Sequence, residues 1–379
     1  MWYTSPRLRL TANLTRDRRM QKADPLIRTK LRPPFSRLEL VPRLRLQARI
    51  KEGLCGPLTL VTAPAGFGKS TLVASCVADC GMPVAWLSLD KDDNQVGRFL
   101  NYLVAALRQA DNRVGNEAAQ LLATAQQPVP EAILTCLIND LDAIDREFVL
   151  VLDDYHFINS QAVHDEVTFL LEHCPRTFHL VIATRSDPPL PLARLRARGQ
   201  TVELRAAELG FTEPEAAQFL NDVMGLGLDA GSVAALEERT EGWIAGLQMA
   251  SIALQSHLSM RDRGDASGFI EGFSGTNRYI LDYLLEEVLA GQPPEIQRFL
   301  LHTSILERLT APLCEAVLEV DMPAGSIIDE SAATRQPANL PTCQPCKRVY
   351  YKEINRLGSM PAFCRHIIIS DDNTKKEAV

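Results

Sequence analysis

The order of apolar and polar stretches predicts two structural halves. In the first half, short runs of apolar and β-branched residues predict buried strands at 58–62, 83–90, 148–152, 179–184 and 202–204. Helical spacings of apolar residues lie between these runs, at 98–110, 116–125, 131–144 and 162–172. Strands that alternate with helices are typical of a parallel sheet flanked by helices, so we predict an α/β domain.

From Phe211 onward the pattern is entirely helical. Thr212 with Pro214 and Glu215 forms a typical helix start, because it supplies a cap, an early proline and an acid in the first turn. Helices are predicted at 213–223, 232–239, 242–254, 278–290, 295–302 and 311–320. We find no Ser/His/Asp or Cys/His set here that suggests covalent catalysis. The second half is therefore predicted to be an all-α region.

The strongest functional signal is the stretch 58–71, which reads LTLVTAPAGFGKST. An apolar strand, a glycine-containing turn, Lys69-Ser70 and a helix follow one another, as in a phosphate-binding P-loop. Gly66 and Gly68 allow backbone N–H groups to point at an anion, and the helix N-terminus adds partial positive charge. The predicted nucleotide-binding residues are Ala63, Pro64, Ala65, Gly66, Phe67, Gly68, Lys69, Ser70 and Thr71.

Two residues of this stretch have individual roles, and one departs from the usual pattern. Lys69 is expected to reach the β- and γ-phosphates, and the Ser70 hydroxyl to ligate Mg²⁺. Ala63 stands where the usual P-loop has its first glycine. Alanine tolerates positive φ poorly, which leaves open how the turn is entered. The alternative is a chance Gly-Lys-Ser in a turn.

A second signal is the acid pair Asp153-Asp154 after the apolar run 148–152. Ligands of open α/β sheets bind at the carboxyl ends of the strands, so this pair resembles a Walker B motif. Asp153 is predicted to hold Mg²⁺ through water, and Asp154 to orient or deprotonate an attacking water. Arg185, at the end of the strand 179–184, is predicted to sense the γ-phosphate. The alternatives are an ordinary polar turn and a surface salt bridge.

Composition restricts the class of protein. The 379 residues carry a net charge of −7 and are 46% hydrophobic, which is ordinary for a globular protein and argues against nucleic-acid binding through bulk charge. No run of about 18 apolar residues exists, so no membrane span is predicted. Nine cysteines, an odd number, favour reduced thiols and a cytoplasmic location.

The two ends of the chain lack apolar periodicity. Residues 1–25 are basic and are predicted to be a disordered tail, with a transit peptide as the alternative. Residues 321–379 are predicted to be irregular or disordered. A zinc site in this tail is the less favoured alternative, because its second pair has atypical spacing; it would use Cys343, Cys346, Cys364 and His366.

Several stretches between 26 and 318 together resemble the MalT-like, ATP-dependent LuxR-type transcription activators of the STAND class of signalling NTPases. Their order and spacing agree with that family, in which Ala-Pro-Ala-Gly-Phe-Gly-Lys-Ser is a common P-loop form. The matching stretches include LIRTKLRPPFSRLELVPRLRL, LTLVTAPAGFGKSTLV, FVLVLDDYHFI, HLVIATRSDPPLPLARLRARG and TEGWIAGLQMASIAL.

The resemblance implies an ATP/ADP-binding signalling switch with bound Mg²⁺. It implies slow ATP hydrolysis that controls self-association, ADP in the closed state and an adenine near residues 41–46. The implied domains are a P-loop NTPase domain at 26–210, a helical subdomain at 211–272 and a winged-helix-like domain at 273–320. Family members continue into a helical-repeat sensor and a helix-turn-helix, which residues 321–379 do not resemble. We therefore expect a truncated chain that does not itself bind DNA.

Two other functions remain open at this point. One is a P-loop enzyme, either a kinase or an ATPase, although the basic stretch 190–198 is the only candidate for a kinase lid. An ABC-type ATPase is disfavoured because no LSGGQ-like signature occurs. The other is an inert truncated fragment without DNA binding. If the chain is an enzyme, we expect weak ATPase activity.

Overall fold

The computed structural model describes residues 26–34, 40–124, 129–144 and 146–260, together with 269–270, 282–283, 285–289, 294, 297–298 and 302. The predicted tails at 1–25 and 321–379, most of the predicted winged-helix-like domain and the possible zinc site lie outside these residues. The proposed domain boundaries therefore stay predictions.

A five-stranded parallel sheet forms the centre of the first half, in the order β2-β3-β4-β1-β5. This confirms the predicted α/β class. The strands are β1 (Leu58–Thr62), β2 (Val84–Ser88), β3 (Phe148–Asp153), β4 (Phe178–Thr184) and β5 (Thr201–Arg205). Thr62 pairs with Thr184, and Ser88 pairs with Asp153, so neighbouring strands end together at one edge of the sheet.

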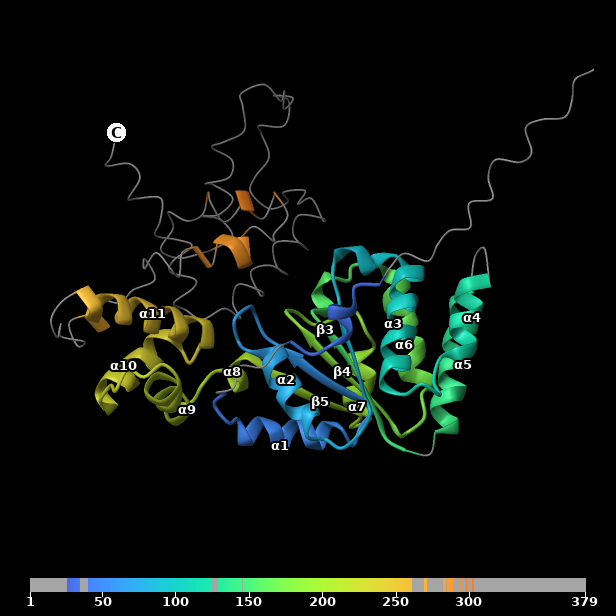
Figure 1. Ribbon diagram of the computed structural model, residues 1–379, viewed down its shortest axis with the longest axis horizontal. Coiled ribbons are helices and arrows are strands. Elements are labelled where there is room, and N and C mark those ends of the chain that lie inside the picture. The colour runs from blue at the N-terminus through green and yellow to red at the C-terminus, as the bar shows by residue number, and fades with distance from the viewer. Residues whose placement is uncertain are drawn as a thin grey trace, which may run out of the picture.

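Helices cover both faces of this sheet (Figure 1). Alternate strand residues face opposite sides, so Leu150 and Leu152 belong to one core cluster and Val149 and Val151 to the other. The first cluster packs against α3 (Val96–Ala110), α4 (Asn116–Thr124), α5 (Pro130–Ala143) and α6 (Gln161–His173). The second packs against α1 (Leu44–Gly53) and α2 (Lys69–Ala78). Burial on both faces explains why the strands read as continuous apolar runs.

Two segments contain helices that were not among the predicted elements. Helix α1 begins at Leu44, a short distance after Val41, which precedes a proline and is biased toward extended backbone. The basic stretch 190–198, considered above as a kinase lid, contains a short helix, α7 (Leu192–Ala197). Its Leu192 and Leu195 lie three positions apart and are both buried, so packing against the core stabilises this turn.

The helical half contains α8 (Ala206–Leu209), α9 (Glu213–Gln218), the π-turn η4 (Phe219–Val223), α10 (Ala230–Thr240) and α11 (Ile244–Met260). The helix start predicted at Thr212 is present, and the Thr212 N–H donates to the Glu215 carboxylate at 2.9 Å. None of the helices in the described part of the chain is long and apolar enough to cross a membrane.

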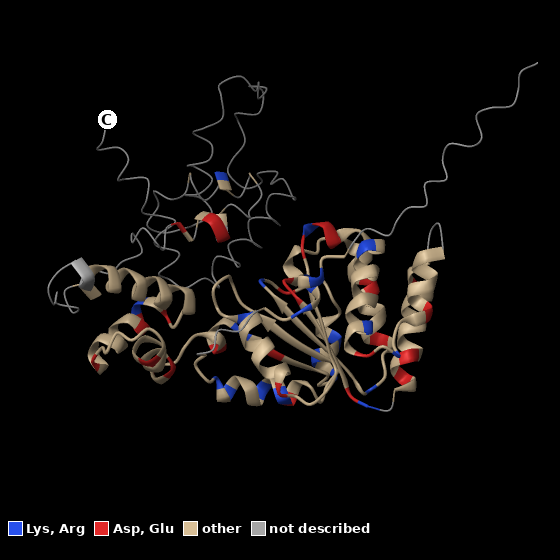
Figure 2. Ribbon diagram, viewed as in Figure 1, with Lys and Arg blue, Asp and Glu red and all other residues tan. Residues whose placement is uncertain are grey.

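Helix α1 joins the sheet to this helical half. Its basic positions are coloured blue on the ribbon of Figure 2. Two arginines at its start bind the segment around α8 and α9. Arg43 is buried, donates to the Leu209 and Gly210 carbonyls and pairs with Glu215 at 3.2 Å. Arg45 reaches the same Glu215 at 3.1 Å. These contacts hold the α9 to α11 group beside the P-loop end of the sheet.

Candidate nucleotide-binding site

The turn between β1 and α2 has the backbone that a P-loop requires. Gly66 and Gly68 both have positive φ, 81° and 70°, a region in which glycine is free of the Cβ clash. Ala63 is not among the residues with positive φ. Its N–H instead donates to the Thr184 carbonyl at 3.3 Å and so extends the β1–β4 pairing by one residue. The expected difficulty with Ala63 therefore does not arise.

Lys69 lies at the start of α2 with only 9% of its surface exposed. Its ammonium donates to the Pro64 carbonyl at 2.9 Å, across the mouth of the turn. Burial, together with the charge of Arg185, lowers the pKa of Lys69 to about 8, although the charges of Asp154 and Asp153 act in the opposite direction. A buried cation at a helix N-terminus favours an anionic ligand, because the negative charge of the ligand compensates for the solvation that the cation loses on burial.

Ser70 and Asp153 meet where the P-loop helix faces the end of β3. The Ser70 hydroxyl donates to Asp153 Oδ1 at 2.8 Å, and the Asp154 N–H donates to the same oxygen at 3.0 Å. Burial, together with the charge of Asp154, raises the pKa of Asp153 to about 6, although these two hydrogen bonds and the charge of Lys69 act in the opposite direction. A hydroxyl and a carboxylate fit Mg²⁺, which commonly binds few protein oxygens together with substrate phosphates. Among the described residues, no group of three or more His, Cys, Asp or Glu could hold a metal.

The two predicted catalytic residues lie at this same edge of the sheet. Asp154 has left-handed backbone, with φ of 55°, and burial raises its pKa while Lys69 and Arg185 oppose the rise. Arg185 follows β4, and its guanidinium donates to the Glu287 carbonyl at 2.7 Å and to its carboxylate at 3.0 Å. The structure thus shows Arg185 in a salt bridge, the alternative raised from the sequence. Catalytic roles for both residues stay predictions.

Sequence reasoning missed the residues that cover the turn from the helical half. The Trp243 indole N–H donates to the Ala65 carbonyl at 3.0 Å, and the Ala245 N–H donates to the Gly66 carbonyl at 3.0 Å. Tyr283 packs edge-on against the Trp243 ring, with centroids 5.7 Å apart. The available signal was the glycine at 242, which has φ of 68° and breaks the helical pattern just before Trp243.

The arginines of the stretch 190–198 do not gather at Lys69. Arg194 pairs with Glu172, and Arg196 pairs with both Asp187 and Glu203. These partners lie on α6, just after β4 and on β5, and apart from Glu203 the side chains concerned are exposed. The arrangement gives this stretch a structural use and does not support a kinase lid built from it.

Comparison with known proteins agrees with these features. Residues 285–335 match the model of the MalT winged helix domain. The serine/threonine-protein kinase PknK of Mycobacterium tuberculosis is 35% identical over 292 residues, which are 76% of this chain and 26% of that protein. The HTH-type transcriptional regulator MalT of Yersinia enterocolitica is 34% identical over 288 residues, or 76% of this chain and 31% of that regulator. The chain thus spans less than a third of the length of either relative.

A solved structure shows the same fold. The Walker-type ATPase PABY2304 of Pyrococcus abyssi aligns with a TM-score of 0.51 and 16% identity, covering 87% of this chain and 92% of that one. The parallel sheet, the P-loop turn with its facing acid pair, the MalT relatives and the winged-helix match all agree. The chain therefore has the fold of a P-loop ATPase, and its sequence is similar to MalT and PknK and, at residues 285–335, to the MalT winged helix domain.

Proposed function

We propose that this chain is the ATP/ADP-binding switch module of a LuxR-type transcriptional activator. In this proposal it hydrolyses ATP slowly with Mg²⁺, and the bound nucleotide controls self-association. The observation that carries the proposal is the convergence of Lys69, Ser70 and the acid pair at one edge of the sheet. The name of the MalT relative, a transcriptional regulator, supports the regulatory part.

The chain's own residues divide the work as follows. The P-loop turn and Lys69 hold the phosphates, and Ser70 with Asp153 holds Mg²⁺, which when bound neutralises charge on the phosphate oxygens. Asp154 orients the attacking water and accepts its proton, and Arg185 stabilises charge on the γ-phosphate. Arg185 can do this only after it leaves Glu287, so hydrolysis is slow while that salt bridge holds.

Self-association is the proposed readout because the helical half touches the nucleotide edge directly. Trp243 and Ala245 bond to the turn itself, and Glu287 bonds to Arg185. A change of nucleotide that moves the turn or Arg185 therefore changes the position of the helical half. This coupling gives a bound nucleotide control over the surface that the helical half presents.

The test is to identify the nucleotide that the purified chain carries, by denaturing it and separating the released nucleotide by chromatography. We expect ADP from the parent and none from Lys69→Ala, because that change removes the cation that faces the β- and γ-phosphates. Lys51→Ala, on the exposed side of α1, is the matched control and should retain ADP. A folded parent that carries no nucleotide and binds neither ATP nor ADP in calorimetry would refute the proposal.

A further inference from the structure

The 3-10 turn η2 (Lys91–Asn94) is held in place by the buried carboxylate of Asp93. The side chain of Asp93 is fully buried and accepts from Lys30, from Arg98 Nε at 3.2 Å and from the Asp90 N–H at 2.9 Å. Lys30 also bonds Asp90 at 2.9 Å. A buried charge with all these partners is costly to disturb, so η2 is a rigid support.

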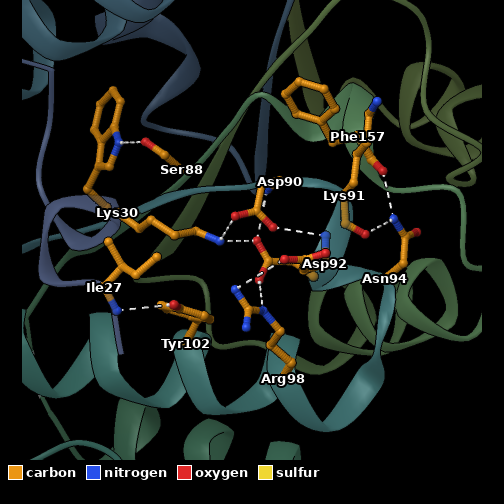
Figure 3. A network of polar contacts seen from close by, with 12 residues as sticks. Ile27, Lys30, Ser88, Asp90, Lys91, Asp92, Asn94, Arg98, Tyr102 and Phe157 are labelled. Carbon is orange, nitrogen blue, oxygen red and sulfur yellow. Dashed lines mark hydrogen bonds and ion pairs between the residues drawn. The ribbon is translucent and has the colours of Figure 1, made fainter. Parts of the chain in front are cut away.

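Asn94, the last residue of η2, uses most of its amide to hold a different segment. Its Nδ2 donates to the Phe157 carbonyl at 2.8 Å and to the Lys91 carbonyl at 2.9 Å (Figure 3). Its Oδ1 accepts from the N–H groups of Asn159 and Ser160 at 2.6 and 2.8 Å. Both donors and both lone pairs of the amide are thus occupied. Three of the four bonds go to residues 157–160, just after the acid pair.

These three bonds close the turn that presents Asp154. Asp154 begins the 3-10 turn η3 (Tyr155–Phe157), and its carbonyl accepts from the Phe157 N–H at 3.1 Å. Left-handed backbone at Asp154 costs about 1 kcal/mol or more and persists only where neighbouring contacts impose it. The Asp154 N–H bond to Asp153 holds one end of the turn, and Asn94 holds the other.

We propose that Asn94 is a positioning residue for Asp154, a role that rests on the proposed function. In hydrolysis the water oxygen forms a bond to the γ-phosphorus while the bond between that phosphorus and the β–γ bridging oxygen breaks. ADP leaves with that electron pair, and Asp154 takes the proton of the water. In this proposal Asn94 acts through residues 157–160 and not on the nucleotide or the water. It fixes the turn that aims the Asp154 carboxylate.

The test compares Asn94→Ala and Asn94→Asp with Asn101→Ala, an exposed asparagine on α3 whose amide bonds only the Gly97 carbonyl, at 2.7 Å. ATP and ADP affinities, single-turnover hydrolysis and thermal melting are measured for each variant. Misplacement of a reacting group by about 1 Å can cost about a hundredfold in rate. We expect Asn94→Ala to lose about tenfold to a hundredfold in hydrolysis rate while its nucleotide affinity and melting temperature stay close to those of Asn101→Ala.

Asn94→Asp separates positioning from folding. A carboxylate can still accept from the Asn159 and Ser160 N–H groups but cannot donate to the Phe157 carbonyl, so we expect an intermediate rate. The comparison of hydrolysis rate with nucleotide affinity is the second readout, because a misplaced Asp154 lowers the rate and leaves the affinity unchanged. Should Asn94→Ala fail to fold, Asn94→Asp and this comparison carry the test.

The outcomes distinguish a failure of the Asn94 proposal from a failure of the proposed function on which it rests. If the parent and Asn94→Ala hydrolyse ATP at the same rate, the role of Asn94 is overturned and the proposed function still stands. Equal losses of rate, affinity and melting temperature would also overturn it, because they indicate a merely structural residue. A folded parent that binds no nucleotide would refute the proposed function, and the role of Asn94 with it.

Discussion

Gly66 tests whether the helical half is docked on the P-loop turn. A Cβ at Gly66 would lie 2.6 Å from Trp243 Nε1, 2.6 Å from the Ala245 Cβ and 3.0 Å from the Tyr283 hydroxyl. Carbon atoms do not approach so closely, so Gly66→Ala must push the Trp243 segment away from the turn. The same residue also has φ of 81°, which alanine adopts at a cost.

The expected loss has two parts. Left-handed backbone costs an alanine about 1 to 2 kcal/mol. The displaced segment costs about 1 to 3 kcal/mol more, either as overpacking strain or as the loss of the Trp243 and Ala245 hydrogen bonds to the turn. We therefore expect Gly66→Ala to lower the free energy of unfolding by about 2 to 5 kcal/mol.

Gly81→Ala measures the first part alone, so the difference between the two variants gives the second part. Gly81 has φ of 73° and nothing within 4 Å of the position of a Cβ, so the backbone cost remains and the contact cost disappears. Urea unfolding, followed by tryptophan fluorescence and by circular dichroism, gives the free energy for both variants. The free energy of unfolding of the parent should exceed that of Gly81→Ala by only about 1 to 2 kcal/mol. Equal losses in the two variants would refute the docking of the helical half on Gly66.

Three further predictions concern the acid pair and Arg185. Asp154→Asn should leave ATP affinity within about threefold of the parent and slow hydrolysis by at least about a hundredfold, measured by calorimetry and single turnover. Arg185→Ala should change the free energy of unfolding by less than about 1 kcal/mol, because its salt bridge is partly exposed, yet slow hydrolysis measurably. Asp153 has a raised pKa of about 6, so the folded state binds its proton more tightly than the unfolded state does. As the pH falls from 7 to 5 without Mg²⁺, the free energy of unfolding of the parent should therefore rise by about 1 kcal/mol relative to that of Asp153→Asn, measured by urea unfolding. A fall in this free energy over the same range would contradict the raised pKa.

Local patterns were enough to predict the sheet and the phosphate-binding turn. Strands buried on both faces read as apolar runs. The turn depends on Gly66 and Gly68, which lie within three residues of Lys69 in the sequence. The acid pair could be placed because the carboxyl ends of parallel strands share one edge. The basic stretch 190–198 was interpreted less well, since the burial of Leu192 and Leu195 follows from packing rather than from charge.

The contacts between distant segments could not be predicted in this way. Trp243 bonds to a residue 178 positions away, and Asn94 bonds to Phe157 across 63 positions. Neither pair leaves a periodic signal, because each depends on how whole elements pack. The pairing of Arg185 with Glu287 has the same origin. The parts of the site that concern regulation and positioning are therefore the parts that a single sequence did not reveal.

The docking of the helical half also bears on how the turn can bind phosphate. In a trans peptide the C=O and the N–H that follows point in opposite directions, and no cis peptide occurs in the described part of the chain. The carbonyls of Ala65 and Gly66 point toward Trp243 and Ala245, so the N–H groups of Gly66 and Phe67 point away from them. The same two peptide units thus present carbonyls to the helical half and N–H groups to the opposite side. A ligand that rotates these N–H groups must also disturb the carbonyl contacts, which gives the turn a direct mechanical link to α11.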